Sequence, residues 1–202
     1  FTEKLLEFCA IQVNGTTKAT FGEHEIDFKA PYPRVSMTEA ILKFTGFDIT
    51  GKSEQELFDF AKSIGIEVNE TMGKGKLIDE IFGEKCEGNF IQPTFITDYP
   101  VEMSPLTKKH RSKEGLTERF ELMVCGKEIA NAYSELNDPI DQRERFEDQL
   151  KLSEKGDDEA GQFIDEDFLR ALEYGMPPTS GLGIGMDRLI MFLTNNASIQ
   201  EV

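Results

Sequence analysis

The chain has 202 residues, of which 39% are hydrophobic and 30% charged, and its formal net charge is −16. These values are typical of a globular protein with one large or two small domains, and no run of about 18 apolar residues predicts a membrane-spanning helix. The excess of acidic residues argues against a domain that binds nucleic acid by itself, since such domains carry a stripe of basic residues. The nearest candidate is the short basic loop KKHRSK at 108–113.

The cysteines and histidines argue against two kinds of stabilising site, a disulfide framework and a zinc site. Cys9, Cys86 and Cys125 are odd in number and share no CxxC spacing, which indicates reduced thiols in a cytoplasmic protein rather than a disulfide framework. With only His24 and His110, a His-rich zinc site is not expected. The chain opens with FTEKLLEFC, without an initiator Met or a signal segment, and we interpret it as a piece of a longer protein.

Apolar spacing and turn residues predict the elements in chain order. We expect a helix in FTEKLLEFCAIQV, a hairpin in TTKATF and HEIDF, helices at 37–45, 54–64 and 74–87, a strand at 89–101, a hairpin at 119–136, helices at 139–155 and 164–173, a strand from 181 that leads into a helix at 187–194, and a last strand in ASIQEV. Strands that return by hairpins, with helices grouped apart at about 36–88, predict an α+β fold with an antiparallel sheet.

The stretch GFDITGKS at 46–53 matches the phosphate-binding P-loop pattern letter for letter. A P-loop needs a buried strand before its first glycine, but SMTEAILKFT precedes Gly46, and Ser36 with Glu39 forms a capping box that opens a helix there. Ser53 is followed by Glu56, a second capping box. We therefore interpret the stretch as a turn between two helices.

A second glycine-rich stretch, GLGIGMDR at 181–188, is more informative. In a strand, Gly181, Gly183 and Gly185 fall on one face, and a bare strand face usually admits something close, such as a flat ring or another backbone. Arg188 follows at the start of the next helix, where its planar guanidinium can stack on a ring or bind a phosphate, and Asp187 is placed to cap that helix. The alternative is that a neighbouring helix packs tightly against the glycines.

The hairpin RFELMVCGKEIANAYSEL carries two carboxylates that a two-residue loop at Gly126 and Lys127 brings to one face. Glu121 and Glu128 then repel one another unless a cation neutralises them, and hard oxygen ligands suit Mg²⁺ held together with substrate phosphates. The alternative is that both carboxylates lie on a solvated sheet face.

Three further polar residues of this hairpin, Asn131, Tyr133 and Glu135, share a face by their spacing of two. A plain hairpin would put them on the side opposite Glu128. If all of these residues serve one site, a one-residue bulge must lie between Glu128 and Asn131.

Long stretches of the chain resemble lysyl-tRNA synthetases of the bacterial, class II type. The matching stretches are FIQPTFITDYPVEMSPL, RFELMVCGKEIANAYSELNDP, GDDEA and LEYGMPPTSGLGIGMDRLIMFLTN, and GLGIGMDR is similar to the third class II signature motif. The resemblance implies an antiparallel sheet that binds bent ATP, formed here by a partial catalytic core at 1–35 and 89–202, incomplete at both ends, with a helical insertion at 36–88. It also implies that L-lysine reacts with ATP to give lysyl-adenylate, from which the lysyl group passes to tRNA.

The resemblance implies a role for each candidate residue. Glu121 and Glu128 would hold Mg²⁺ on the ATP phosphates. The lysine pocket would be formed by Asn131, Tyr133 and Glu135, the adenosine floor by Gly183 and Gly185, and Arg188 would stack on adenine, reach the terminal phosphate and act in catalysis.

The first two class II motifs and the anticodon-reading barrel have no counterpart in these residues. We therefore expect the fragment to be inactive alone. The resemblance itself implies a parent enzyme that is cytoplasmic, homodimeric and without membrane contact. Two alternatives stay open: a paralogue that activates lysine and delivers it to a protein, and a non-catalytic adenylate-binding module.

Overall fold

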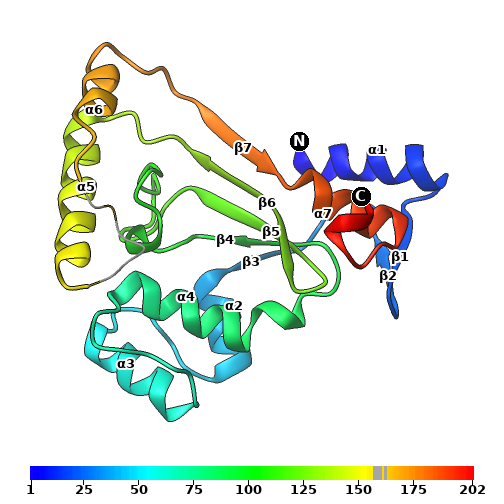
Figure 1. Cartoon of the computed structure of the whole chain (residues 1–202), viewed down its shortest axis with the longest axis horizontal. Coiled ribbons are helices and arrows are strands. Elements are labelled where there is room, and N and C mark those ends of the chain that lie inside the picture. The colour runs from blue at the N-terminus through cyan, green and yellow to red at the C-terminus, as the bar shows by residue number, and fades with distance from the viewer. Residues whose placement is uncertain (157–160, 162) are drawn as a thin grey trace.

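The computed structural model describes residues 1–156, 161 and 163–202, and a five-stranded sheet lies at its centre (Figure 1). The strands are β1 (Lys18–Phe21), β2 (His24–Asp27), β3 (Arg34–Ser36), β4 (Thr94–Thr97), β5 (Arg119–Val124), β6 (Lys127–Ser134) and β7 (Ser180–Ile184). The α-helices are α1 (Thr2–Asn14), α2 (Met37–Thr45), α3 (Glu54–Ser63), α4 (Lys74–Lys85), α5 (Pro139–Glu154), α6 (Glu166–Glu173) and α7 (Met186–Thr194). Three short 3₁₀ helices are η1 (Glu87–Asn89), η2 (Val101–Met103) and η3 (Ile199–Glu201).

The central sheet has the strand order β3-β4-β5-β6-β7, and β1 and β2 form a separate antiparallel pair. The neighbours from β4 to β7 are antiparallel, whereas β3 runs parallel to β4. Parallel neighbours need a long crossover connection, and the segment with α2, α3 and α4 provides it between β3 and β4. The predicted α+β class is confirmed, with β3 as a parallel addition to the antiparallel strands.

One face of the sheet is apolar and packs on α1, α7 and the β1–β2 pair. Buried side chains of this cluster come from the sheet, from both helices and from the pair; they include Leu6, Ala10, Ile26, Phe95, Leu122, Val124, Ile129, Ala130, Leu189 and Phe192. Figure 1 shows α1, α7 and the hairpin gathered at one end of the sheet. Removal of this apolar surface from water stabilises the arrangement, by roughly 1.5–3 kcal/mol for each large side chain.

The opposite face is divided between a covered and an open part. Helices α2, α3 and α4 cover the β4 side, where Ile96 and Met123 join the helices in a second buried cluster. Across β5, β6 and β7 this face carries polar residues and glycines, which the candidate site uses. The division of the chain into a core and an insertion at 36–88 stays a prediction.

The two capping boxes form as predicted. The Ser36 hydroxyl accepts from the Glu39 backbone N–H at the start of α2, and the Ser53 hydroxyl accepts from the Glu56 backbone N–H at the start of α3. Gly46 ends α2 in the left-handed conformation, with φ of 75°. The GFDITGKS stretch is therefore a turn between helices, and the reading that excluded a P-loop is confirmed.

Two predicted strands differ from the structure. The strand expected at 89–101 is only four residues long, β4, because the chain forms η1 immediately before this region and Pro100 begins the turn into η2. The prediction of a strand in ASIQEV is wrong. Ser198 caps η3 there by accepting from the Gln200 backbone N–H, which favours a helical turn over an extended chain.

Candidate functional site

Residues on the open face of β5, β6 and β7 form the candidate site. Residues directly paired in antiparallel strands point to the same face. Two rows of pairs cross the three strands: Glu121, Asn131 and Gly183 in one, and Arg119, Tyr133 and Gly181 in the next. The structure therefore brings the predicted magnesium carboxylate, two predicted lysine-pocket residues and the glycine strand together on one face.

The loop that joins β5 to β6 differs from its prediction by one residue. Val124 pairs with Lys127, so the two loop residues are Cys125 and Gly126 rather than Gly126 and Lys127. Both have positive φ, 49° and 65°, as a tight two-residue hairpin turn of type I′ requires. The Cys125 backbone N–H donates to the Ile91 carbonyl at 3.0 Å, and this contact holds the loop in place.

The predicted bulge in β6 is confirmed. Successive residues of β5 pair with Glu128 and Ala130, so Ile129 is the extra residue in β6. The bulge sends Ile129 and Ala130 consecutively into the apolar core, where each is 1% exposed. Glu128 consequently lies on the open face together with Glu121.

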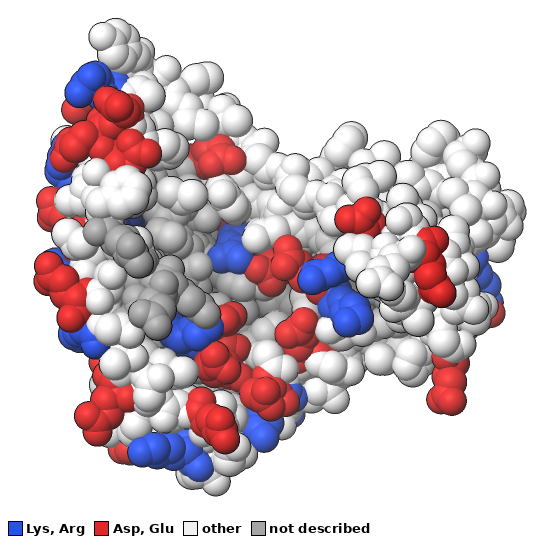
Figure 2. Space-filling view, viewed as in Figure 1, with Lys and Arg blue, Asp and Glu red and all other residues white. Residues whose placement is uncertain are grey.

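Burial and the negative charge of Glu121 raise the pKa of two neighbouring carboxyl groups, those of Glu128 and Glu87. Burial, and then the charge of Glu121, raise the pKa of Glu128, and the guanidinium groups of Arg188 and Arg119 oppose the rise. Burial and Glu121 also raise the pKa of Glu87 in η1, a residue that the sequence analysis did not single out. All three carboxylates line a cavity of about 420 Å³, and Figure 2 shows acidic and basic side chains around the hollow between the helices and the sheet.

Gly183 in β7 and Gly185 directly after this strand have open space beside them, as expected of a floor for a ligand, whereas the Glu135 side chain covers Gly181. A Cβ at Gly183 would meet only the Asn131 carbonyl, at 3.8 Å, and one at Gly185 would meet nothing closer than 3.8 Å. Among the described residues no helix packs on the glycine face, so the alternative of tight helix packing is wrong for this part of the chain.

Arg188 lies exposed in the first turn of α7 and its Nη1 donates to the Glu128 carbonyl at 2.5 Å. The guanidinium is therefore held beside the carboxylate pair. The prediction that Asp187 caps the helix is wrong, because α7 begins one residue earlier: Gly185 is the N-cap residue, and Asp187 lies in the first turn without a capping hydrogen bond. There its charge still favours the positive end of the helix dipole.

Glu135 lies at the far end of the glycine strand from Arg188. A Cβ at Gly181 would collide with the Glu135 carboxylate, so this side chain crosses the bare strand. Burial raises the pKa of Glu135, and burial together with the Glu135 charge raises the pKa of Tyr133. The structure thus brings the three predicted lysine-pocket residues, Asn131, Tyr133 and Glu135, to the same face; their roles stay predictions.

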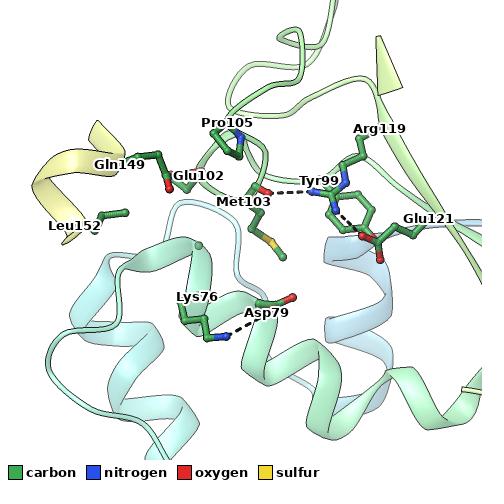
Figure 3. Close-up of a pocket in the computed structure, with 11 residues that line it drawn as sticks. Lys76, Asp79, Tyr99, Glu102, Met103, Pro105, Arg119, Glu121, Gln149 and Leu152 are labelled. Carbon is green, nitrogen blue, oxygen red and sulfur yellow. Dashed lines mark hydrogen bonds and ion pairs between the residues drawn. The ribbon is translucent and has the colours of Figure 1, made fainter. Parts of the chain in front are cut away.

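Arg119 lies in the middle of this face and was not among the site residues predicted from the sequence. Its guanidinium donates to Glu121 Oε1 at 2.5 Å and to Asn131 Oδ1 at 3.3 Å, and Figure 3 shows its side chain over the Tyr99 ring beside a cavity of about 330 Å³. Its position two residues before Glu121 on one strand, hence on the same face, is a signal that could have identified it.

The basic loop at 108–113 does not present an unpaired basic patch. Its side chains are paired with acidic or amide groups of the chain: Lys108 with Asn137, Lys109 with Asp141, His110 and Lys113 with Asp98, and Arg111 with Glu118. The basic side chains of the loop are therefore engaged in contacts within the chain. The loop therefore does not alter the conclusion drawn from the acidic composition.

The GDDEA stretch, membrane-spanning helices and metal sites can be assessed only within the residues that the structure describes. Residues 157–160, most of the GDDEA stretch, lie outside the described part of the chain. Within the described part, no helix has the length and apolar character needed to cross a membrane, and no group of three or more His, Cys, Asp or Glu side chains is arranged to hold a metal. A Mg²⁺ site that relies on substrate phosphates needs only one or two carboxylates.

Comparison with known proteins gives consistent matches over the whole chain. The model of the family described as tRNA synthetases class II (D, K and N) matches residues 1–202. Proteins named lysine–tRNA ligase are 81% identical in Christiangramia forsetii, 72% in Porphyromonas gingivalis and 64% in Azobacteroides pseudotrichonymphae. Each match covers 100% of this chain but 35%, 35% and 40% of the relative, so the chain spans little more than a third of their length.

Proposed function

Because the chain belongs to the family of class II tRNA synthetases (D, K and N), we propose that the protein that contains it joins L-lysine to ATP and transfers the lysyl group to tRNA. The observation that carries the proposal is the shared face of β5, β6 and β7, on which Glu121, Glu128, Asn131, Tyr133 and the glycines meet. The relatives named lysine–tRNA ligase support the choice of lysine.

In this proposal Glu135 binds the side-chain ammonium of lysine. A charge-assisted hydrogen bond to a partly buried carboxylate is stronger than a neutral one. Burial raises the pKa of Glu135, and an ammonium group would lower it again by favouring the charged form. A site built around such a bond rejects uncharged amino acids, because they would leave the carboxylate unpaired. Tyr133 flanks the lysine stem and Asn131 adds a polar contact.

The residues at the other end of the face fit ATP with Mg²⁺. Glu121 and Glu128 supply hard oxygen ligands. Burial and, after it, repulsion by Glu121 raise the pKa of Glu128, and a divalent cation would offset both costs of holding the carboxylates charged. When bound, Mg²⁺ would neutralise negative charge on the phosphates. Gly183 and Gly185 receive the adenosine, and Arg188 stacks on its base and contacts the terminal phosphate.

The chemical step then depends on positioning. The lysine carboxylate attacks the α-phosphate and pyrophosphate leaves, so no nucleophile of the protein is needed. Holding both substrates on one rigid sheet face provides the orientation on which such a reaction depends. We propose that this occurs in the cytoplasm and in a homodimer.

The test is amino-acid-dependent exchange of pyrophosphate into ATP by the full-length protein. We expect exchange with lysine and Mg²⁺, little exchange with norleucine, which has no ammonium group on its side chain, and transfer of labelled lysine to tRNA. Absence of lysine-dependent exchange would contradict the proposal and favour a non-catalytic module. Exchange followed by transfer to a protein rather than to tRNA would favour the lysine-activating paralogue.

A further inference from the structure

Arg119 bonds side chains that are assigned to the two different parts of the candidate site. It lies at the start of β5 with its side chain 15% exposed. Its Nη2 donates to Glu121 Oε1 at 2.5 Å and its Nε donates to Asn131 Oδ1 at 3.3 Å. One planar guanidinium therefore bonds a carboxylate assigned to Mg²⁺ and an amide assigned to the lysine pocket.

The same guanidinium is anchored from its other side. Its Nη1 donates to the Met103 carbonyl at 2.9 Å and to Ser104 Oγ at 3.0 Å, and its central carbon lies 4.4 Å from the centre of the Tyr99 ring. Tyr99 is 2% exposed, so the aromatic support is fixed in the core. Arginine suits this role because its donors form a rigid fork, unlike the rotating ammonium of lysine.

The anchoring loop is itself held by α5. Arg145 Nη1 donates to the Ser104 carbonyl at 3.1 Å, and Gln142 Nε2 donates to the Pro105 carbonyl at 2.9 Å. Both α5 residues are buried. A continuous set of bonds thus runs from α5 through the loop at 103–105 to Arg119.

We propose that Arg119 is a positioning residue that fixes Glu121 and Asn131 relative to each other, so that the magnesium carboxylate and the lysine pocket are held in register. The proposal rests on the proposed function. Arg119 binds Oε1 of Glu121 and leaves the second carboxylate oxygen for the cation. It also holds the oxygen of the Asn131 amide and leaves the NH₂ group for the substrate.

A purely structural role is the competing explanation, since Arg119 also ties the loop at 103–104 to the sheet. The two explanations predict different measurements. A structural anchor affects the free energy of unfolding, whereas a positioning residue also affects lysine affinity and the Mg²⁺ concentration needed for nucleotide binding.

The experiment uses the full-length protein and calorimetric titration of lysine and of a non-hydrolysable ATP analogue at several Mg²⁺ concentrations. Loss of a group that orients metal ligands typically weakens metal binding about 10- to 100-fold. We therefore expect Arg119→Met to weaken lysine binding and to raise the half-saturating Mg²⁺ concentration, each by about tenfold or more, and Arg119→Lys to give smaller changes in both.

Arg111→Met is the matched control. Arg111 also forks onto a glutamate, Glu118, but its side chain is 81% exposed and lies outside the site. We expect its affinities for lysine and for the analogue to stay within about twofold of the unmodified protein, as is usual for exposed ion pairs.

A double-mutant cycle tests the coupling itself. If Arg119 acts through Asn131, the effects of Arg119→Met and Asn131→Ala on lysine affinity are not additive. The proposal is overturned if Arg119→Met lowers thermal stability but binds lysine and Mg²⁺ like the unmodified protein. Should Arg119→Met fail to fold, unchanged affinities in Arg119→Lys overturn it in the same way. A full-length protein that binds no lysine contradicts the proposed function before any variant is measured.

Discussion

Gly183 allows a prediction that separates ligand binding from stability. A Cβ at this position would make only an ordinary contact, 3.8 Å from the Asn131 carbonyl. Gly183→Ala should therefore fit the folded chain without strain. Because glycine in a strand loses more conformational freedom on folding than alanine does, we expect the substitution to raise the free energy of unfolding by about 0.5–1 kcal/mol.

The same methyl group should interfere with nucleotide binding. It projects from the open face of β7 into the space where the adenosine is proposed to lie. Inserting a methyl group into a close-packed contact costs about 1–3 kcal/mol, which corresponds to roughly 5- to 150-fold weaker binding. We expect Gly183→Ala to lower ATP affinity within this range while lysine affinity changes little.

The assay combines thermal unfolding with titration of Mg·ATP into the full-length protein. Gly88→Ala is the control, since Gly88 is exposed and a Cβ there would meet nothing within 4 Å. If Gly183→Ala binds ATP as tightly as the unmodified protein, the glycine face is not the adenosine floor. If Gly183→Ala instead strongly lowers the free energy of unfolding, the claim that a methyl group fits beside Gly183 without strain is refuted.

Three further predictions concern separate parts of the chain. Glu135→Gln should weaken lysine binding by about 2 kcal/mol or more, since it removes a charge-assisted bond, whereas calorimetry should find ATP binding retained; equal loss of both ligands would contradict the pocket assignment. The raised pKa of Glu128 means that its contribution to stability is present at low pH and is lost as pH rises through that pKa; Glu128→Gln should flatten this dependence in metal-free denaturant titrations, and an unchanged slope would contradict it. Ser53→Ala should lower the free energy of unfolding by about 1 kcal/mol through loss of the α3 cap, and Lys52→Ala should leave nucleotide binding intact; loss of ATP affinity in either variant would revive the P-loop reading.

Local sequence signals predicted the elements that depend on local physics. The capping boxes at Ser36 and Ser53 fix where α2 and α3 begin, because each satisfies a backbone donor within four residues. The bulge could also be predicted, since Glu128 and Asn131 are three residues apart and share one face only if an extra residue lies between them. The small residue Ala130 leaves room for the kink that such a bulge makes.

The errors arose where a contact from elsewhere in the chain decides the outcome. The hairpin loop is Cys125–Gly126 because the chain at 90–91 accepts from both loop N–H groups, each at 3.0 Å, and no local pattern shows this. The parallel pairing of β3 with β4 likewise depends on the distant end of the helical segment. The position of Arg119 beside Glu121 on β5 is visible in the sequence, but its anchoring is not, because its partners at 103–104 are fifteen or sixteen residues away.

The bulge explains how one short hairpin serves both a core and a site. Without the extra residue in β6, Glu128 would point to the face opposite Asn131, where Leu122 and Val124 are fully buried. An unpaired carboxylate buried there would cost several kcal/mol. Ile129 instead enters the core and Glu128 stays on the open face, where the charges of Glu121 and Arg188 act on its carboxylate. Apolar packing on one face therefore enforces the spacing of the carboxylates on the other. We accordingly expect a deletion of Ile129 to destroy Mg²⁺-dependent nucleotide binding together with stability, whereas Glu128→Gln should remove only the former.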